Sequence, residues 1–238
     1  MKFMSKFFIS ILLYLSVFLN LNAQEENAAV SDSIVVQEKY GLRLGLDASK
    51  LTRSFIESDY SGFEINGDYR LGKRLYVAGE LGAEEKTTAT PYLNSTAKGS
   101  YFKVGLDYNM YENWAGMDNM VYSGIRFGIS NFNQTLNNYT IYDTNSQTWG
   151  PHEITESERF SGLTTGWLEL LLGVKAEVLN NLFLGVNFQI KGRLFETAPN
   201  NFENIYIPGF GRTFDSGRFS SGLGYTISYL IPLYKRDR

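Results

Sequence analysis

His152 is the one histidine of the chain, and acidic and hydroxyl residues surround it at Glu153, Glu156, Ser157 and Glu158. A Ser-His-acid site would therefore have to use this imidazole as its general base. No strand spacing fixes a nucleophile beside it, and an isolated histidine in a polar loop is more often solvated surface. We predict no catalytic residues, and we keep a lipid-modifying enzyme that acts through His152 as an alternative.

Other groups of residues in the sequence give weaker indications of a reactive or binding site. Glu84 and Glu85 form an adjacent acid pair, but strand alternation sends them to opposite faces, so we expect charges at a strand end. Gly209-Phe-Gly211 lacks the third glycine and the helix of a nucleotide fingerprint and predicts a mobile loop. With no cysteine and one histidine, thiolate chemistry, disulfides and multi-histidine metal centres are excluded. We expect no cofactor and no metal.

Eight segments between Tyr40 and Ile231 could position such groups, because each alternates apolar and polar residues with no charge in the apolar register. This pattern predicts an all-β fold, an eight-stranded antiparallel up-and-down transmembrane β-barrel. The apolar register reads Leu42, Leu44, Leu46; Phe63, Ile65, Gly67, Tyr69; Leu75, Val77, Gly79, Leu81; Phe102, Val104, Leu106, Tyr108; Val121, Ile125, Phe127, Ile129; Leu168, Leu170, Leu172, Val174; Leu182, Leu184, Val186, Phe188, Ile190; and Phe219, Leu223, Tyr225, Ile227, Tyr229, Ile231.

The polar register is expected to face inward, because it is rich in glycine and an eight-strand lumen is barely wide enough for its side chains. It carries eight acidic and seven basic residues, which could pair with one another and close the lumen. These charges are Arg43, Asp47, Glu64, Asp68, Arg70, Glu80, Glu84, Lys103, Asp107, Arg126, Glu169, Lys175, Glu177, Lys191 and Arg193.

The N-terminus has the pattern of a secretory signal peptide. Lys2 and Lys6 precede an apolar run from Phe7 to Leu19, and Ala23 offers a cleavage site. The run is shorter than the roughly 20 residues of a spanning helix. We predict a signal peptide at residues 1–23, a disordered periplasmic lead-in at 24–38 and a barrel at 39–238. The net charge of -3 gives no reason to expect a nucleic-acid partner.

Connection lengths predict the direction of the barrel, since outward loops of such barrels are longer than periplasmic turns. Both termini are then periplasmic. The expected outward loops are Ser49–Asp59, Lys86–Lys98, Asn133–Ser161 and Thr197–Gly217, and the inward turns are Gly72–Arg74, Tyr111–Met120 and Leu179–Asn181.

Aromatic residues in these connections are candidate partner contacts, because aromatics are enriched at interfaces. The alternative is that they only cover the barrel mouth. They are Trp114, Tyr139, Tyr142, Trp149, Phe202, Tyr206 and Phe210.

Two stretches carry a family resemblance. Gly222-Leu-Gly-Tyr-Thr-Ile-Ser-Tyr229 resembles the C-terminal assembly signal of outer-membrane proteins, although the chain continues to Arg238. Tyr40-Gly-Leu-Arg-Leu-Gly-Leu-Asp47, with the segments that follow to Gly82, resembles an uncharacterised Bacteroidota family of outer-membrane β-barrels. This resemblance implies a link to the barrel subunit that accompanies the Bacteroidota β-barrel assembly machinery.

The leading hypothesis from the sequence is a non-enzymatic outer-membrane barrel that serves as a structural or accessory subunit of an outer-membrane complex. Its expected partners are outer-membrane lipid and other outer-membrane proteins, with no small-molecule substrate evident. A lipid-modifying enzyme and a surface adhesin are the alternatives, and a small pore is the least favoured.

Overall fold

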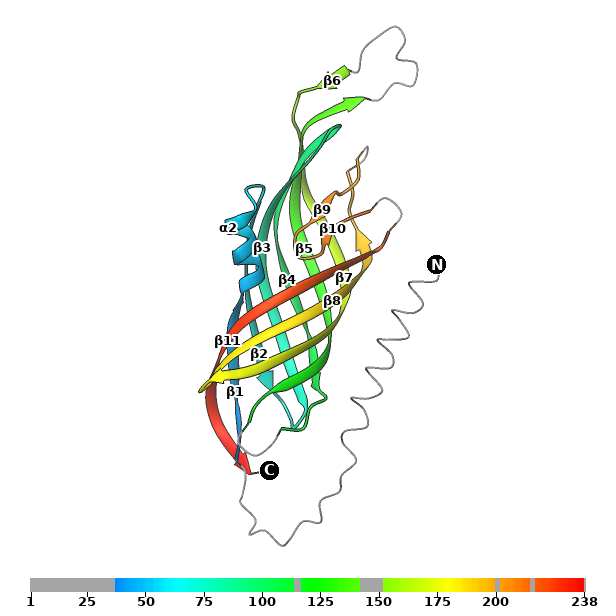
Figure 1. Cartoon of the computed structure of the whole chain (residues 1–238). Coiled ribbons are helices and arrows are strands. Elements are labelled where there is room, and N and C mark those ends of the chain that lie inside the picture. Colours follow the sequence, from blue (N-terminus) through cyan, green and yellow to red (C-terminus); the bar gives the residue numbers. More distant parts are fainter. Residues whose placement is uncertain (1–36, 114–116, 142–151, 200–201, 215–216, 238) are drawn as a thin grey trace, which may run out of the picture. The chain divides into compact units, whose positions relative to one another are not determined.

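The structure is a computed structural model that describes residues 37–113, 117–141, 152–199, 202–214 and 217–237 (Figure 1). The predicted signal peptide and nearly all of the predicted lead-in lie outside these residues. The predicted start of the barrel at residue 39 is two residues from the start of the first strand at Gln37.

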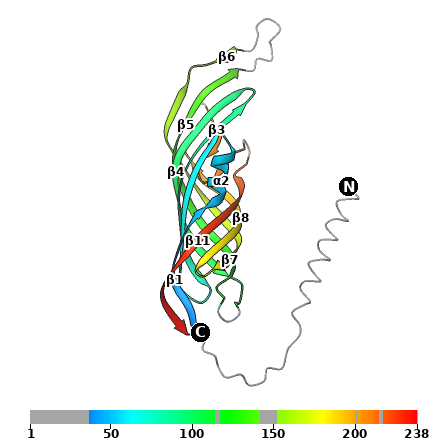
Figure 2. The same cartoon turned by 60° about the vertical axis from the view of Figure 1, so that its left-hand side comes forward.

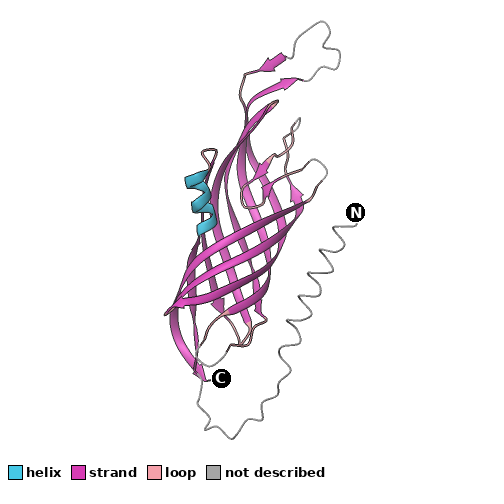
Figure 3. Cartoon of the chain, in the orientation of Figure 1, coloured by secondary structure: helices cyan, strands magenta, loops and turns pink. Residues whose placement is uncertain are grey.

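Eight long antiparallel strands form a closed ring, in which each strand pairs with the next along the chain and the last pairs with the first (Figures 1 and 3). The predicted eight-stranded up-and-down barrel is therefore confirmed. The ring consists of β1 (Gln37–Asp47), β2 (Tyr60–Arg70), β3 (Leu75–Thr90), β4 (Leu93–Asn109), β5 (Met120–Ile141), β7 (Glu158–Leu179), β8 (Leu182–Glu196) and β11 (Phe219–Asp237). Smaller elements are α2 (Ala48–Ile56), β6 (His152–Ile154), β9 (Tyr206–Ile207) and β10 (Gly211–Arg212).

The two faces of the wall differ as the alternation predicts. On β7, Leu170 and Leu172 point outward and are 56% and 58% exposed. Glu169, the residue before Leu170, points inward and is fully buried. Arg43, Lys103 and most other charges of the polar register are likewise buried inside the ring, whereas Glu177 and Arg193 are partly exposed at strand ends. An apolar outside around a charged inside is the arrangement of a membrane-spanning barrel. In the described part of the chain, no helix is long and apolar enough to cross a membrane.

Several inward glycines are required by crowding, as expected for a narrow lumen. A Cβ on Gly105 would lie 1.8 Å from the carbonyl oxygen of Ile125, which is backbone and has no room to move. A Cβ on Gly124 would lie 2.2 Å from Asp107 Oδ1. These positions hold the wall of β4 and β5 together by having no side chain.

Gly105→Ala is expected to lower barrel stability by about 1 to 3 kcal/mol, the range for overpacking a filled interior. Gly79→Ala is the matched control, because a Cβ on this outward glycine meets only Lys103 O, at 3.7 Å. Urea-induced unfolding in lipid vesicles measures both. Equal loss of stability in the two variants would contradict the steric explanation.

The long strands extend further than the sequence predicts. Residues 86–98 are not a loop, because β3 runs to Thr90 and β4 resumes at Leu93. Residues 133–161 are partly strand as well, since β5 continues to Ile141, β7 begins at Glu158, and β6 pairs with the end of β5. Figure 2 shows these strands rising beyond the rest of the wall. Both faces of the extension are polar, so it gives no alternation signal.

The short connections agree with the prediction. Residues 72–74 form a tight turn between β2 and β3, and Asn181, in the turn between β7 and β8, has a φ of 65°. Asparagine tolerates this left-handed conformation. In the long connection from 111 to 119, the Asn113 side chain donates to Asn119 O (2.7 Å). Trp114 and Gly116 lie outside the described residues.

Candidate functional site

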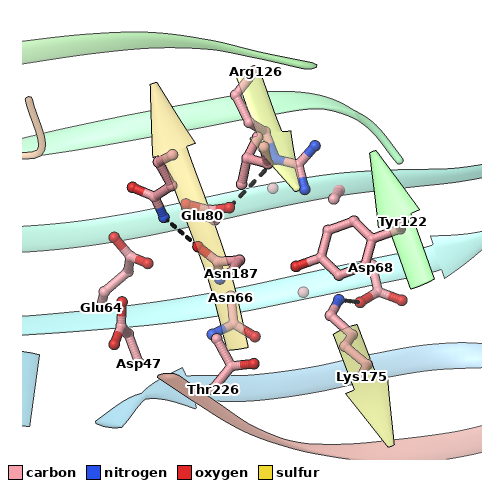
Figure 4. A pocket seen from close by; sticks show the side chains of 15 residues that line it. Asp47, Glu64, Asn66, Asp68, Glu80, Tyr122, Arg126, Lys175, Asn187 and Thr226 are labelled. Carbon is pink, nitrogen blue, oxygen red and sulfur yellow. Dashed lines mark hydrogen bonds and ion pairs between the residues drawn. The ribbon is translucent and has the colours of Figure 1, made fainter. Parts of the chain in front are cut away.

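The centre of the lumen is a network of buried ion pairs built from facing strands (Figure 4). Lys103 Nζ contacts the carboxylates of Glu80, Glu64 (3.3 Å) and Glu169 (3.9 Å). Arg126 is bound by Asp107 (2.8 Å) and by Glu80 (3.3 Å). The pairing predicted from the balanced inner charges is therefore present.

The turn end of the lumen is closed in the same way. Asp68 receives Arg43 (2.9 Å) on one oxygen and Lys175 (2.6 Å) on the other. The Arg43 guanidinium also lies over the ring of Phe183, 4.6 Å from its centroid. This stacking on an aromatic face suits a guanidinium better than an ammonium.

Little space remains between these groups. The cavity bordered by Glu80, Tyr122, Arg126 and Lys175 has a volume of about 20 Å³, room for about one water molecule. Within the described residues, the centre of the barrel is a packed polar core.

The opposite end of the lumen, where β1 ends and α2 begins, is the mouth. Glu84 organises it. Its carboxylate accepts from the Lys50 ammonium of α2, from the Tyr206 hydroxyl (2.7 Å) and from the Gly209 amide (3.1 Å). Lys191 of β8 donates to the carbonyl of the same Gly209 (2.7 Å). The connection that carries β9 and β10 is thus tied to two walls of the barrel.

A hydrophobic cluster completes this inserted segment, which we call the plug (residues 202–213). Phe210 meets Trp167 edge to face, with ring centroids 5.9 Å apart, and Ile207 is fully buried beside them. Gln134 accepts from the Ile205 amide (3.0 Å) and donates to Glu203 O (2.9 Å). The plug is therefore held by apolar packing and by hydrogen bonds.

The prediction of a mobile loop at Gly209-Phe-Gly211 is wrong. Gly209 and Gly211 have φ values of +80° and +109°, and Gly209 is buried against Tyr101. The glycines allow a tight backbone turn inside the mouth and do not confer mobility.

A polar pocket of about 240 Å³ remains between α2 and the plug, lined by Lys50, Arg53, Glu84 and Lys191 among others. Ser49 also lines it, and its hydroxyl donates to Asp47 Oδ1 (2.5 Å). Three of its charged side chains are engaged, since Lys50 pairs with Glu84, Arg53 pairs with Glu57 and Lys191 donates to a backbone carbonyl.

Comparison with known proteins places the chain in a family. The model for the family described as Domain of unknown function (DUF6048) matches residues 4–236. The chain belongs to this family. No curated protein matches it. A solved structure that it is similar to is Ail, the attachment invasion locus protein of Yersinia pestis, with 8% identity, a TM-score of 0.40, and coverage of 83% of this chain and 99% of that one.

Two of the predicted contact residues of this DUF6048 chain are not on its surface. Tyr206 and Phe210 are 7% and 2% exposed, because they belong to the plug. They cover the mouth, which was the alternative reading of these aromatics, and are unavailable for external contact. Phe202 stacks on Phe160 (6.5 Å between centroids), and Tyr139 is half-buried where β5 pairs with β6. Trp114, Tyr142 and Trp149 lie outside the described residues.

The remaining candidates of the DUF6048 chain separate in space. The backbone of His152 pairs with Ile141, and its side chain lies outside the described part of the structure. Glu84 faces the mouth interior, whereas Glu85 faces outward and pairs with Lys98 (2.8 Å). The prediction that the two side chains lie on opposite faces of the strand is therefore confirmed. The prediction that both are charges at a strand end is wrong for Glu84, which is buried, because β3 continues past it to Thr90.

Sequence reasoning missed three residues that hold the mouth together. Gln134 and Lys50 lie in segments predicted to be loops, where no register could be assigned. The inward position of Trp167 could have been predicted from strand alternation, because Trp167 precedes the outward-facing Leu168. An indole in so narrow a lumen predicts a packed mouth.

The end of α2 is held by an exposed ion-pair network that responds to pH. Hydrogen bonds from Arg53 lower the pKa of Glu57 to about 2, and Lys86 of β3 contacts the same carboxylate (3.1 Å). The unfolded value is roughly 4.3. Because the folded pKa is depressed, this contribution to stability is complete above the unfolded value and is lost as the pH falls toward 2.

We expect a spin label at Phe55→Cys, on the exposed side of α2, to become more mobile as the pH falls from 5 to 2. The absence of natural cysteine makes the label specific. Adding Glu57→Gln should give high mobility throughout and a smaller pH dependence. A spectrum that does not change over this range would show that Glu57 does not hold α2.

Proposed function

We propose that this chain is an integral outer-membrane β-barrel that acts without catalysis, as a structural or accessory subunit of an outer-membrane complex. The observation that carries the proposal is the filled lumen. Lys103, Arg126 and their carboxylates occupy its centre, and the plug occupies its mouth. Surfaces left for function are the outer wall and the strands that project beyond it.

The outer-membrane location is supported by the apolar outer wall, because barrels of this kind span membranes with strands. The predicted signal peptide and the C-terminal assembly signal support export to the same membrane. The short turns at 72–74 and 180–181 lie at the end of the barrel where both described termini lie, which favours periplasmic termini (Figure 1).

The proposed complex is one concerned with outer-membrane protein assembly. Support for this finer assignment is the resemblance of residues 40–82 to Bacteroidota barrels associated with the assembly machinery. A barrel with a closed interior suits such a role, since it offers lateral surface to a larger barrel without adding a leak.

An adhesin is the second candidate, and one observation favours it. Strands β5 and β7 each have 22 residues, whereas a transmembrane strand needs about 9 to 11. The excess projects beyond the mouth. Trimming residues 137–157, which spares Gln134 and Phe160 beside the plug, should abolish binding to a surface receptor without loss of the folded barrel, if adhesion is the function.

The test of the leading proposal is purification at native expression in mild detergent. We expect a stoichiometric outer-membrane protein to co-purify and to dissociate in harsher detergent. Recovery of the barrel alone, in membranes where it is folded and protease-resistant, would overturn the accessory role. Single-channel recording is expected to show no steady conductance.

A further inference from the structure

The pocket between α2 and the plug borders a strand edge that, in the described part of the chain, no other strand covers. β11 pairs with β8 along residues 219–229, but with β1 only from Thr226 onward, because β1 ends at Asp47 and α2 follows it. Three consecutive residues of β11, 221–223, line the pocket. Since successive strand residues face opposite sides, a cavity lined by three in a row lies against the edge of the strand and not against one face.

The two faces of β11 differ beside this edge. Phe219 and Leu223 point outward and are 72% and 61% exposed. At the inward position of Gly222, a Cβ would lie 3.7 Å from Lys191 Nζ and 3.2 Å from Gln189 Oε1. The missing side chain therefore leaves the pocket open beside the Lys191 ammonium. An apolar outer surface and a buried cation thus meet at one uncovered strand edge.

Lys191 is a buried cation with spare hydrogen-bonding capacity. Its side chain is 8% exposed, it donates to Gly209 O (2.7 Å), and the carboxylate of Glu169 lies 3.9 Å from its Nζ. A lysine ammonium has three donors, and a buried charge is costly unless it is both paired and hydrogen-bonded. Among the described residues, two of the three donors have no acceptor within hydrogen-bonding distance. They are available to a ligand in the pocket.

The acids that line the pocket already have donors from the protein. Glu84 holds its three donors at the mouth, and Glu64 contacts the Lys103 ammonium (3.3 Å). Asp47 caps α2 by accepting from the Ser49 amide (2.7 Å). The group that would complete the pocket is therefore an anion, because it supplies the charge-assisted acceptors that the Lys191 ammonium lacks.

We propose that this pocket binds the anionic head group of a membrane amphiphile, a carboxylate or a phosphate, through Lys191. The acyl chain leaves the pocket over the edge of β11 and lies along Phe219 and Leu223 on the outer wall. At about 240 Å³, the pocket is smaller than the sites of drug-sized ligands, which begin at roughly 300 Å³, so it holds the head group and not the chain. The inference uses the membrane location of the barrel and does not depend on the accessory role.

The test is photo-crosslinking of the folded barrel in nanodiscs of neutral phosphatidylcholine. The probe is palmitate that carries a diazirine in its acyl chain. We expect its adducts, mapped by mass spectrometry, to concentrate at residues 219–225 and at α2. Unlabelled palmitate and palmitoyl lysophosphatidate should compete with the probe, whereas methyl palmitate, which has no charge, should not. The stronger of the two competitors identifies the head group as a carboxylate or a phosphate.

Two variants remove the pocket chemistry, and a third is the matched control. Lys191→Met should reduce the adducts at residues 219–225 about tenfold or more, the effect of losing a hydrogen bond to a charged group. Gly222→Met, which fills the space beside the ammonium, should do the same. Arg193→Met should leave the adducts unchanged, because Arg193 is the next cation of β8 but pairs with Glu196. Heat-modifiable mobility on gels verifies that each variant is folded, and if the pocket variants do not fold, competition in the unaltered chain still decides the question.

Any of four outcomes would overturn the proposal. Adducts spread over the whole outer wall, with no competition, would mean that the probe only dissolves in the surrounding lipid. Equal competition by methyl palmitate and palmitate would remove the need for an anion. Inorganic phosphate that competes as well as lysophosphatidate would make the pocket a site for a free anion. An unchanged yield of adducts in folded Lys191→Met would exclude Lys191 as the contact.

Discussion

Replacing Lys103 by methionine is expected to destabilise the barrel by about 3 to 5 kcal/mol, the range for breaking a buried ion pair by removing one partner. Lys103 is 1% exposed, and its ammonium contacts three carboxylates, from Glu64, Glu80 and Glu169. Its loss leaves these three buried acids without this cation, and Glu64 and Glu80 line a cavity with room for only about one water molecule. Urea unfolding in vesicles, followed by tryptophan fluorescence, measures the difference.

Arg193→Met is the matched control for this prediction. Arg193 pairs with Glu196 (2.6 Å) at the end of β8, where its side chain is 15% exposed and that of Glu196 26%. Its removal should cost roughly 1 kcal/mol or less, since solvent can replace the contact. A double change of Lys103 with one of its acids should recover part of the loss. Equal destabilisation by the two single variants would mean that the central network is no more buried than the strand end.

Leu170→Arg is expected to lower stability by about 2 to 4 kcal/mol and to reduce the amount of assembled barrel. Leu170 lies in the middle of an outward row between Leu168 and Leu172, so the guanidinium would enter hydrocarbon. Folded and unfolded fractions separate by heat-modifiable mobility on gels.

The control for this second experiment changes the depth in the membrane and keeps the exposed fraction nearly the same. Leu194 points outward near the mouth end of β8, with an exposed fraction of 58% that is close to the 56% of Leu170. Leu194→Arg should cost about 1 kcal/mol or less, because the penalty falls toward the interface. Similar losses at the two positions would contradict the placement of the apolar band.

The sequence was sufficient for the membrane-facing part of the wall, and for a physical reason. Along Leu168–Val174, one face meets lipid and the other meets the lumen, so every second residue must change character. The inward direction of the polar register followed from its glycines. Pairing of the inner charges followed from their balance, although the partners of Lys103 did not, because they come from three different strands.

The mouth could not be predicted in the same way. In Thr87–Thr90 and in the end of β5, both faces of the strand are polar, so no contrast reveals it. The plug has a visible signal, the apolar run Ile205–Phe210 inside a polar connection. Its position depends on Glu84, which is 122 residues from Tyr206 in the chain. Pattern reasoning about neighbours does not reach across that separation.

The glycines of the wall show a further limit. Gly67 and Gly79 were placed in the apolar register from sequence, but a register alone does not say whether a glycine is needed by its own fold. Only the space around each Cβ separates Gly79 from Gly105.

The seam between β1 and β11 makes closure of this barrel depend on both ends of the strand order. The ring closes only when Phe219–Asp237 can pair with β1, and the plug immediately precedes that last strand. Inside the ring, Asp68 is joined to Lys175, which is 107 residues later in the chain. Without Phe219–Asp237, β1 and β8 each keep an unpaired strand edge, which is the kind of edge that pairs with other chains.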